Sequence, residues 1–218
     1  SEAPAVTATA ALLISPDSDM VLYEKNADEK RYPASTTKIM TALLTLEQPD
    51  LDEYFTVDSK AILVEGSSMG LLPGDQVTLR GLAIGMLLHS GNDSAGAAAV
   101  KVGGTTEGFV AMMNERAAEM GLTDTHFATP SGLDADDHYS SAYDMAVLAK
   151  NALANEDFLA ICSTAKTQIA FGNPPYDRWL KNHNRLLEEY DGCVGVKTGF
   201  TKKAGRCLVS AARRDGIT

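Results

Sequence analysis

A serine and a lysine near the start of the chain have the types and spacing that nucleophilic chemistry requires. Ser35 and Lys38 are separated by two residues, in the tetrapeptide STTK. Because residues three positions apart share one face of a helix, the hydroxyl and the amine can meet there. A serine hydroxyl becomes a good nucleophile only when a neighbouring base removes its proton. The spacing therefore predicts a nucleophile and its base.

A lysine can act as that base only if its pKa falls from about 10.4 to near neutrality, which costs on the order of 4 kcal/mol. Two features could lower the pKa. The apolar flank formed by Ile39, Met40 and Ala42 would remove water from the amine, and a second cation nearby would repel a proton. By itself the S-x-x-K spacing is common, and a solvated lysine is its ordinary explanation.

Two further motifs place polar side chains at the ends of predicted elements. Ser90 and Asn92, in the tripeptide SGN, follow an apolar helix, so that the turn could aim a hydroxyl and an amide into a cleft. Lys197, Thr198 and Gly199 end a predicted strand, and the glycine leaves space for a ligand backbone alongside. Taken singly, these motifs are equally consistent with a plain turn and an ordinary strand.

Together, and in the order S-x-x-K, S-x-N, K-T-G, the three motifs resemble the signature of the penicillin-recognising serine enzymes. The surrounding sequence resembles more narrowly the low-molecular-weight D-alanyl-D-alanine carboxypeptidases. The matching stretches are residues 32–42 (YPASTTKIMTA), 89–93 (HSGND), 131–134 (SGLD), 182–187 (NHNRLL), 195–201 (GVKTGFT) and 204–207 (AGRC). The resemblance extends from about residue 8 to the last residue.

The resemblance implies three catalytic residues. Ser35 would be the acylated nucleophile and Lys38 its general base, while Ser90 would relay a proton between the lysines and the leaving amine. These roles agree with the chemistry of acyl transfer, which needs an activated hydroxyl and a path for its proton. No cofactor and no metal enter this scheme.

The resemblance also implies a set of substrate-binding residues. Asn92 would hold the peptide amide of the substrate. Lys197 would help to keep the general base neutral. Together with Thr198 it would also attract the terminal carboxylate of the substrate. The substrate would lie along the edge of this strand, which continues through Gly199. The backbone N–H groups of Phe200 and of the nucleophilic serine would form the oxyanion hole.

The activity implied by the resemblance is removal of the terminal D-alanine from peptidoglycan stem peptides through an acyl-enzyme, with β-lactams acylating the same serine. A class A β-lactamase would add a carboxylate that activates water. No convincing Glu-x-x-Leu-Asn segment lies between residues 92 and 197, and we interpret Glu156 and Asp157 as helix-start charges. A non-catalytic penicillin sensor or a peptidoglycan-binding module would retain the same motifs, so this alternative stays open.

Motifs of other enzyme classes fit the sequence less well than the three motifs above. Residues 66–70 (GSSMG) fit the G-x-S-x-G nucleophile elbow, and Asp134 and His138 follow in the order of a triad. An elbow requires a helix directly after its serine, whereas residues 71–75 (LLPGD) indicate a turn, so we expect a loop at a cleft edge. The four histidines lack H-x-x-x-H and H-E-x-x-H spacing, and no P-loop is present.

Composition limits the classes of partner. The 218 residues (23.2 kDa) are 44% hydrophobic and can bury the core of one large domain or of two intimate lobes. With 19 basic and 29 acidic residues, the net charge is -10, which argues against a nucleic-acid partner. The sequence contains no run of eighteen apolar residues, so it predicts no membrane span.

The three cysteines are Cys162, Cys193 and Cys207. They allow either one disulfide in an oxidising compartment or three free thiols.

The pattern of elements predicts an α/β (α+β) fold. Strands at 6–14 and 20–23 precede five helices, which are followed by strands at 164–170, 193–198 and 207–212. The helices are expected after Pro33 until Pro49, then at 81–88, 93–102 and 106–120, with a further helix from Ser141 to about 153. An antiparallel sheet built from both chain ends (1–60 and 155–218) would be flanked by helices, with an inserted helical lobe (61–154), as in β-lactamases and transpeptidases.

The remaining predictions concern the two ends of the chain. The chain opens on SEAP without a signal sequence, and because peptidoglycan lies outside the cytoplasmic membrane, we expect a cleaved signal peptide and an extracytoplasmic location. The family's domain normally continues past the strand holding Cys207, often into a membrane-associating helix. Residues 1–218 are therefore expected to be a single penicillin-recognising catalytic domain, truncated at its C-terminus, whose missing segment could mediate membrane association.

Overall fold

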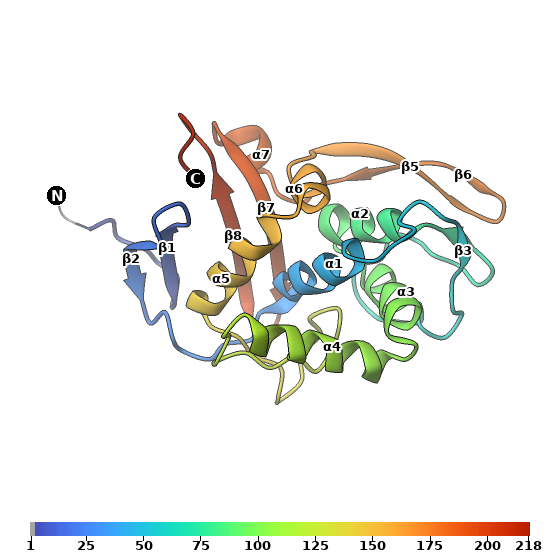
Figure 1. Cartoon of the computed structure of the whole chain (residues 1–218), viewed down its shortest axis with the longest axis horizontal. Coiled ribbons are helices and arrows are strands. Elements are labelled where there is room, and N and C mark those ends of the chain that lie inside the picture. The colour runs from blue at the N-terminus through green and yellow to red at the C-terminus, as the bar shows by residue number, and fades with distance from the viewer. Residues whose placement is uncertain (1–2) are drawn as a thin grey trace.

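Three helices form the centre of the molecule in the computed structural model, which describes residues 3–218 (Figure 1). They are α1 (Lys38–Leu46), α2 (Leu79–His89) and α3 (Asn92–Gly103). Every residue of α1 is buried, because α2, α3, α4, α5 and α6 all pack around it. Because the helix is covered on all sides, its polar residues Lys38, Thr41 and Thr45 are buried together with its apolar ones.

The remaining helices surround this centre: α4 (Thr106–Glu119), α5 (Ala142–Leu153), α6 (Glu156–Cys162) and the short α7 (Leu186–Glu189). Several begin at a side chain that accepts a backbone N–H of the first turn. These caps are Thr78 for α2, Thr105 for α4, Ser141 for α5 and Asn155 for α6. The helix start predicted at Ser141 is therefore confirmed, and the five helices predicted from the sequence are all present.

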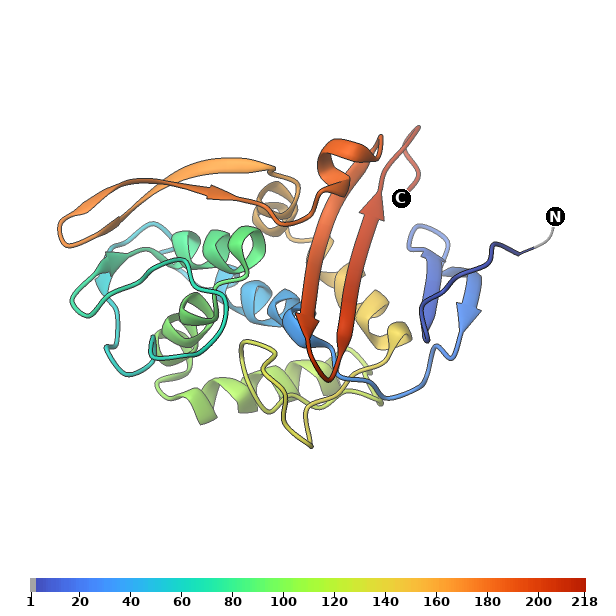
Figure 2. The same ribbon diagram turned by 180° about the vertical axis from the view of Figure 1, so that it is seen from behind.

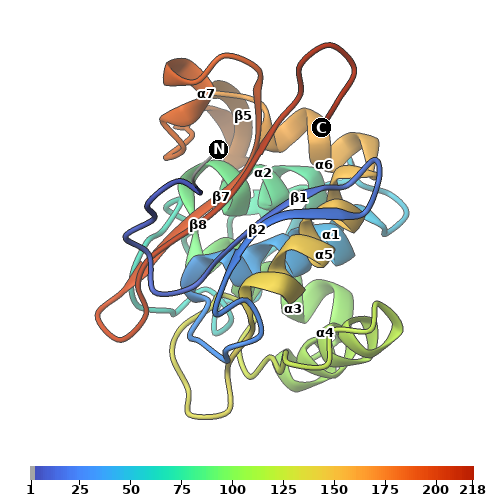
Figure 3. The ribbon, with the colours of Figure 1, turned by 90° about the vertical axis from the view of Figure 1, so that its left-hand side faces the viewer.

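The two predicted terminal hairpins are present: β1 (Ala11–Ser15) with β2 (Met20–Lys25), and β7 (Cys193–Thr201) with β8 (Gly205–Ala212). Each is antiparallel, as expected. They form separate two-stranded sheets, however, and not one sheet built from both chain ends. Both hairpins pack on α5, which contacts β1 and β8. The N-terminal hairpin, which lies on the side that faces the viewer in Figure 3, stands apart from β8 in Figure 2.

A third sheet has four antiparallel strands in the order β3-β4-β5-β6. Its long hairpin consists of β5 (Lys166–Gly172) and β6 (Pro175–Lys181), joined by a tight turn, and both strands pack against α2. The strands β3 (Phe55–Thr56) and β4 (Gln76–Val77) have two residues each, too few for an alternating pattern to predict them. The proposed boundaries of a sheet lobe and a helical lobe stay a prediction.

Two general properties of the described chain bear on its chemistry. Cys162, Cys193 and Cys207 are all free thiols, and burial raises the pKa of the Cys162 thiol to about 12, which makes it unreactive. Within residues 3–218, no helix combines the length and the apolar character needed to cross a bilayer.

Candidate active site

Ser35 and Lys38 meet as their spacing predicts. Ser35 lies in a single 3-10 turn, η1 (Ala34–Thr37), and Lys38 is the first residue of α1. The Lys38 Nζ atom lies 2.9 Å from Ser35 Oγ. Lys38 is fully buried, whereas Ser35 is partly exposed. A ligand can therefore reach the hydroxyl while the amine beneath it stays away from water.

Two further atoms contact the Lys38 amine, and neither can donate a hydrogen bond to it. Nζ donates to Asn92 Oδ1 at 2.7 Å and to the backbone carbonyl of Ser131, also at 2.7 Å. A neutral amine has two N–H groups and one lone pair. If the two N–H groups serve these two acceptors, the lone pair faces Ser35 Oγ, which is the arrangement a general base needs.

Asn92 also binds the protein at the other end of its side-chain amide. Its Nδ2 atom donates to the carbonyl of Glu65 at 2.7 Å, and the side chain is almost fully buried. The amide is thus held in one orientation, with its oxygen on Lys38. Because Nδ2 carries two hydrogens, one remains for a substrate carbonyl, so the expected contact with a peptide amide is compatible with this geometry.

The S-x-N and K-T-G motifs come together at a second buried lysine. Ser90 ends α2 in the left-handed conformation (φ 58°, ψ 32°), which is costly for a residue other than glycine and turns the chain sharply into α3. Lys197, on β7, donates from Nζ to Ser90 Oγ at 3.1 Å and to the carbonyl of Thr198 at 2.6 Å. Ser90 is therefore a hydroxyl with a lysine amine directly beside it.

Burial lowers the pKa values of both lysines, and the charge of Lys197 lowers that of Lys38 further. For Lys197, removal from water lowers the pKa to about 7. For Lys38, burial is the largest cause of a pKa well below the ordinary value, and the charge of Lys197 lowers it further. The carboxylate of Asp93 acts in the opposite direction on Lys38. The predicted second cation that favours a neutral Lys38 is therefore present in the structure.

The K-T-G strand lies directly against the turn that holds the nucleophile, as Figure 2 shows for β7 and the start of α1. A Cβ atom added to Gly199 would be 2.8 Å from the Ser35 nitrogen and 3.1 Å from that of Thr36, so no larger residue fits there without movement. Beyond the glycine, Phe200 is mostly exposed. Of the predicted binding residues, Thr198, Gly199 and Phe200 are accessible, and Lys197 lies beneath them.

Two functional features were missed by the sequence analysis. The carbonyl of Ser131 contacts Lys38, although the SGLD stretch that contains it served only to identify the family resemblance. Asp134 in the same stretch accepts a hydrogen bond of 3.0 Å from Thr201 at the end of β7. The loop at 128–134 thus contacts both the amine and the K-T-G strand. A backbone carbonyl gives no signal of its own in a sequence, since every residue carries one.

The nucleophile-elbow motif at 66–70 is a loop, as expected, and its conformation is set by Asp93. The buried carboxylate of Asp93 accepts hydrogen bonds from Ser68 Oγ (2.7 Å) and from the backbone N–H groups of Met69 (2.9 Å), Gly70 (3.1 Å) and Leu71 (2.9 Å). The serine of the motif therefore faces a carboxylate and no helix follows it. The loop instead supplies the carbonyl of residue 65 that orients Asn92.

The other alternative residues also have structural roles. Glu156 and Asp157 lie in the first turn of α6, as expected for helix-start charges, and Asp157 pairs with Arg80 at 2.6 Å. His138 is fully buried and contacts Thr37, not the serine of the elbow motif. Over residues 3–218, no cluster of three or more His, Cys, Asp or Glu side chains could hold a metal ion.

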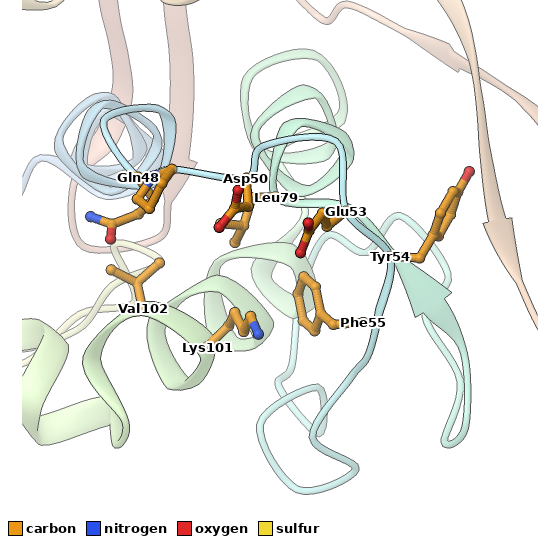
Figure 4. A pocket seen from close by; sticks show the side chains of 9 residues that line it. Gln48, Asp50, Glu53, Tyr54, Phe55, Leu79, Lys101 and Val102 are labelled. Carbon is orange, nitrogen blue, oxygen red and sulfur yellow. The ribbon is translucent and has the colours of Figure 1, made fainter.

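A cavity of about 220 Å³ lies away from these residues. It is lined by the chain that follows α1, by the first residue of α2 and by the last turn of α3, including Gln48, Tyr54, Leu79 and Lys101 (Figure 4). Ser90 and Asn92 lie at the opposite ends of α2 and α3. Because an eleven-residue helix is about 16 Å long, the cavity and the lysine pair are at opposite ends of the helical centre.

We expect Asp93→Asn to destabilise the protein by about 2–4 kcal/mol, because an amide offers one acceptor atom where the carboxylate offers two, and charge-assisted bonds are the strong ones. Urea unfolding would measure this change. Asp75→Asn is the matched control, since Asp75 is also buried but its carboxylate accepts, among the residues that the structure describes, only the N–H of Leu72. Equal losses in the two variants would contradict the anchoring role of Asp93.

We expect Lys197→Met to be more stable than the wild type at pH 6, on the order of 2 kcal/mol or more. The pKa of this lysine is about 7 in the folded chain and about 10.4 in the unfolded chain. Below pH 7 the lysine is protonated in both the folded and the unfolded chain, so the wild type bears the full cost of burying its charge. Between pH 7 and about 10.4 the unfolded chain binds more protons than the folded chain. Wild-type stability therefore rises with pH over this range, and the advantage of the variant shrinks. A difference that does not change between pH 6 and 10, measured by urea unfolding, would refute the low pKa.

Comparison with known proteins agrees with the geometry. A family model described as D-alanyl-D-alanine carboxypeptidase (peptidase family S11) matches residues 1–218. The D-alanyl-D-alanine carboxypeptidase DacF of Bacillus subtilis is 40% identical over 215 residues, covering 96% of this chain and 55% of that protein. A D-alanyl-D-alanine carboxypeptidase of Mycobacterium tuberculosis is 38% identical, over 92% of this chain and 68% of that protein.

Solved structures are similar over the whole chain. The crystal structure of a Streptomyces DD-transpeptidase superposes with a TM-score of 0.94 at 33% identity, covering 100% of this chain and 89% of that one. The predicted fold class is thereby confirmed. The chain spans about half the length of the Bacillus subtilis relative, 55%. With a family match over its full length, the chain belongs to peptidase family S11, the D-alanyl-D-alanine carboxypeptidases.

Proposed function

We propose that this chain is a serine-type D-Ala-D-Ala carboxypeptidase that removes the terminal D-alanine from peptidoglycan stem peptides. The observation that carries the proposal is the 2.9 Å contact between Ser35 Oγ and a fully buried Lys38 amine. Burial and a second lysine favour the neutral amine, which is the form that can accept a proton. Membership of the family supplies the substrate class.

In the first step, Lys38 accepts the proton of Ser35 Oγ while the oxygen attacks the carbonyl carbon of the penultimate D-alanine. The negative charge that develops on the carbonyl oxygen is stabilised by the backbone N–H groups of Ser35 and Phe200. A proton then passes through Ser90, which lies beside Lys197, to the amine of the terminal D-alanine. The C–N bond breaks, D-alanine leaves, and the acyl-enzyme remains.

In the second step, water hydrolyses the ester, and Lys38 serves again as the base that removes a proton from the water. The substrate lies along β7, where its terminal carboxylate meets the positive field of Lys197 and the hydroxyl of Thr198. The strand edge at Gly199 lets the peptide backbone approach Ser35 closely. Asn92 donates its remaining Nδ2 hydrogen to an amide carbonyl of the stem peptide.

The proposal extends to inhibitors, location and organisation. β-Lactams acylate Ser35, because their strained amide resembles the scissile bond and their leaving group stays attached. The protein acts outside the cytoplasmic membrane, where its substrate is, and residues 1–218 form one penicillin-recognising catalytic domain. Association with the membrane through a further C-terminal segment is part of the same proposal, and nucleic acid is not a partner.

We expect a fluorescent penicillin to label the wild-type protein covalently and Ser35→Ala to lose the label, since no other hydroxyl contacts the Lys38 amine among the described residues. Ser68→Ala is the matched control, because Ser68 is the serine of the elbow motif at 66–70. It should keep the label. The modified peptide is identified by intact-mass measurement and digestion. A labelled Ser35→Ala protein, or an unlabelled Ser68→Ala protein, would overturn the assignment of the nucleophile.

Release of D-alanine from a diacyl-Lys-D-Ala-D-Ala peptide separates the proposed activity from its alternatives. We expect many turnovers of the peptide and slow hydrolysis of the penicilloyl-enzyme, because the acidic residues that come closest to the class A pattern, Glu156 and Asp157, lie in the first turn of α6 as helix-start charges. Fast penicillin hydrolysis without D-alanine release would instead indicate a β-lactamase. Labelling without turnover of either compound would indicate a sensor.

A further inference from the structure

The carbonyl of Ser131 is held on the Lys38 amine by a buried network that the catalytic scheme does not include. Building on the proposed function, we propose that His138, Thr37 and Thr41 are positioning residues for the general base. They hold the turn at 128–133 so that the Ser131 carbonyl accepts one hydrogen of Lys38 and directs the lone pair of the amine at the Ser35 hydroxyl.

The contacts of His138 define which of its nitrogens carries the proton. Nδ1 lies 2.9 Å from the backbone nitrogen of Ala128 and 3.3 Å from that of Thr129. Both of these groups are donors, so Nδ1 must accept, and the single proton of a neutral ring is on Nε2. Burial lowers the pKa of His138 to about 4, which keeps the ring neutral at physiological pH.

The protonated Nε2 of His138 joins the turn to the nucleophile segment. It lies 2.8 Å from Thr37 Oγ1, and Thr37 is the residue directly before Lys38. One helical turn further along, Thr41 Oγ1 donates to the carbonyl of Pro130 at 2.6 Å. Residues four apart share one helix face, so the two threonines bind the turn and the histidine packed on it from one face, at two points one helical turn apart.

The turn is also rigid internally. Thr129 Oγ1 donates to the carbonyl of Leu133 at 3.0 Å and accepts the N–H of Gly132 at 3.2 Å. A Cβ atom added to Gly132 would be 1.9 Å from the carbonyl oxygen of Ala34, so the turn lies in direct contact with the turn of the nucleophile. Because contacts on both sides hold the turn in place, the Ser131 carbonyl points at Lys38 Nζ.

The position of the turn at 128–133 affects the acylation of Ser35 and not the binding of a ligand. The Ser131 carbonyl faces the buried amine, while the groups proposed to hold the substrate lie on β7 and on Asn92. If the turn shifts, the amine loses one of its two fixed acceptors and its lone pair no longer has a set direction. Small displacements of a catalytic group lower a rate by about tenfold to a hundredfold.

The test measures acylation by a chromogenic β-lactam in stopped flow, which gives the dissociation constant of the noncovalent complex and the acylation rate constant separately. Thr37→Val and Thr41→Val remove one hydroxyl each and nearly keep the volume. We expect each to lower the acylation rate constant about tenfold or more, with the dissociation constant within about twofold of wild type. Thr37→Ser and Thr41→Ser keep the hydroxyl and should restore most of the rate.

Thr45→Val is the matched control. Thr45 is equally buried on the same helix, but its hydroxyl donates to the carbonyl of Thr41 within α1 and does not contact the turn at 128–133. It should therefore acylate at the wild-type rate, even if its melting temperature falls as much as those of the other valine variants.

Wild-type rate constants in folded Thr37→Val and Thr41→Val, or equal losses in Thr45→Val, would overturn the positioning role. A wild-type protein that no β-lactam or D-Ala-D-Ala peptide acylates would overturn the proposed function itself, and the positioning role with it.

Discussion

The burial of two lysine side chains close together is the constraint on which the rest of this structure depends. Lys38 and Lys197 are each about 1% exposed or less, and a charged amine in such a place is unfavourable by several kcal/mol. The protein lowers that cost by favouring the neutral form, and the repulsion between the two amines acts in the same direction. Stability at neutral pH and a reactive serine are therefore opposed, as is common at catalytic sites.

The elements around Lys38 and Lys197 keep the two amines away from water and orient them. The wholly buried α1 excludes water from Lys38, and two separate loops hold the acceptors that orient its amine, Asn92 Oδ1 at the start of α3 and the Ser131 carbonyl. One loop is folded on the carboxylate of Asp93 and fixes Asn92; the other is folded on the neutral ring of His138 and fixes the Ser131 carbonyl. The left-handed backbone at Ser90 and the glycine of K-T-G then bring the second lysine and the nucleophile together.

Sequence patterns predicted those parts of the site that act through side chains at regular spacing. The S-x-x-K contact follows from helix geometry, and the order of the motifs predicted that three distant segments converge. The Ser131 and Glu65 carbonyls could not be predicted, because backbone groups carry no residue-specific signal. The two-residue strands β3 and β4 are too short to show alternation, and whether the two terminal hairpins pair with each other is a matter of tertiary packing, which no local pattern shows.

The protonation state of Lys38 is the quantity that the whole account depends on. A protein labelled with 13C at lysine Cε, in which the resonance of Lys38 is identified by its loss in Lys38→Arg, gives the pKa of that amine directly by NMR titration. The account predicts a midpoint well below the ordinary value of about 10.4, and a partial rise of that midpoint when Lys197 is replaced by methionine. A midpoint near 10 in the wild type, unaffected by residue 197, would contradict it.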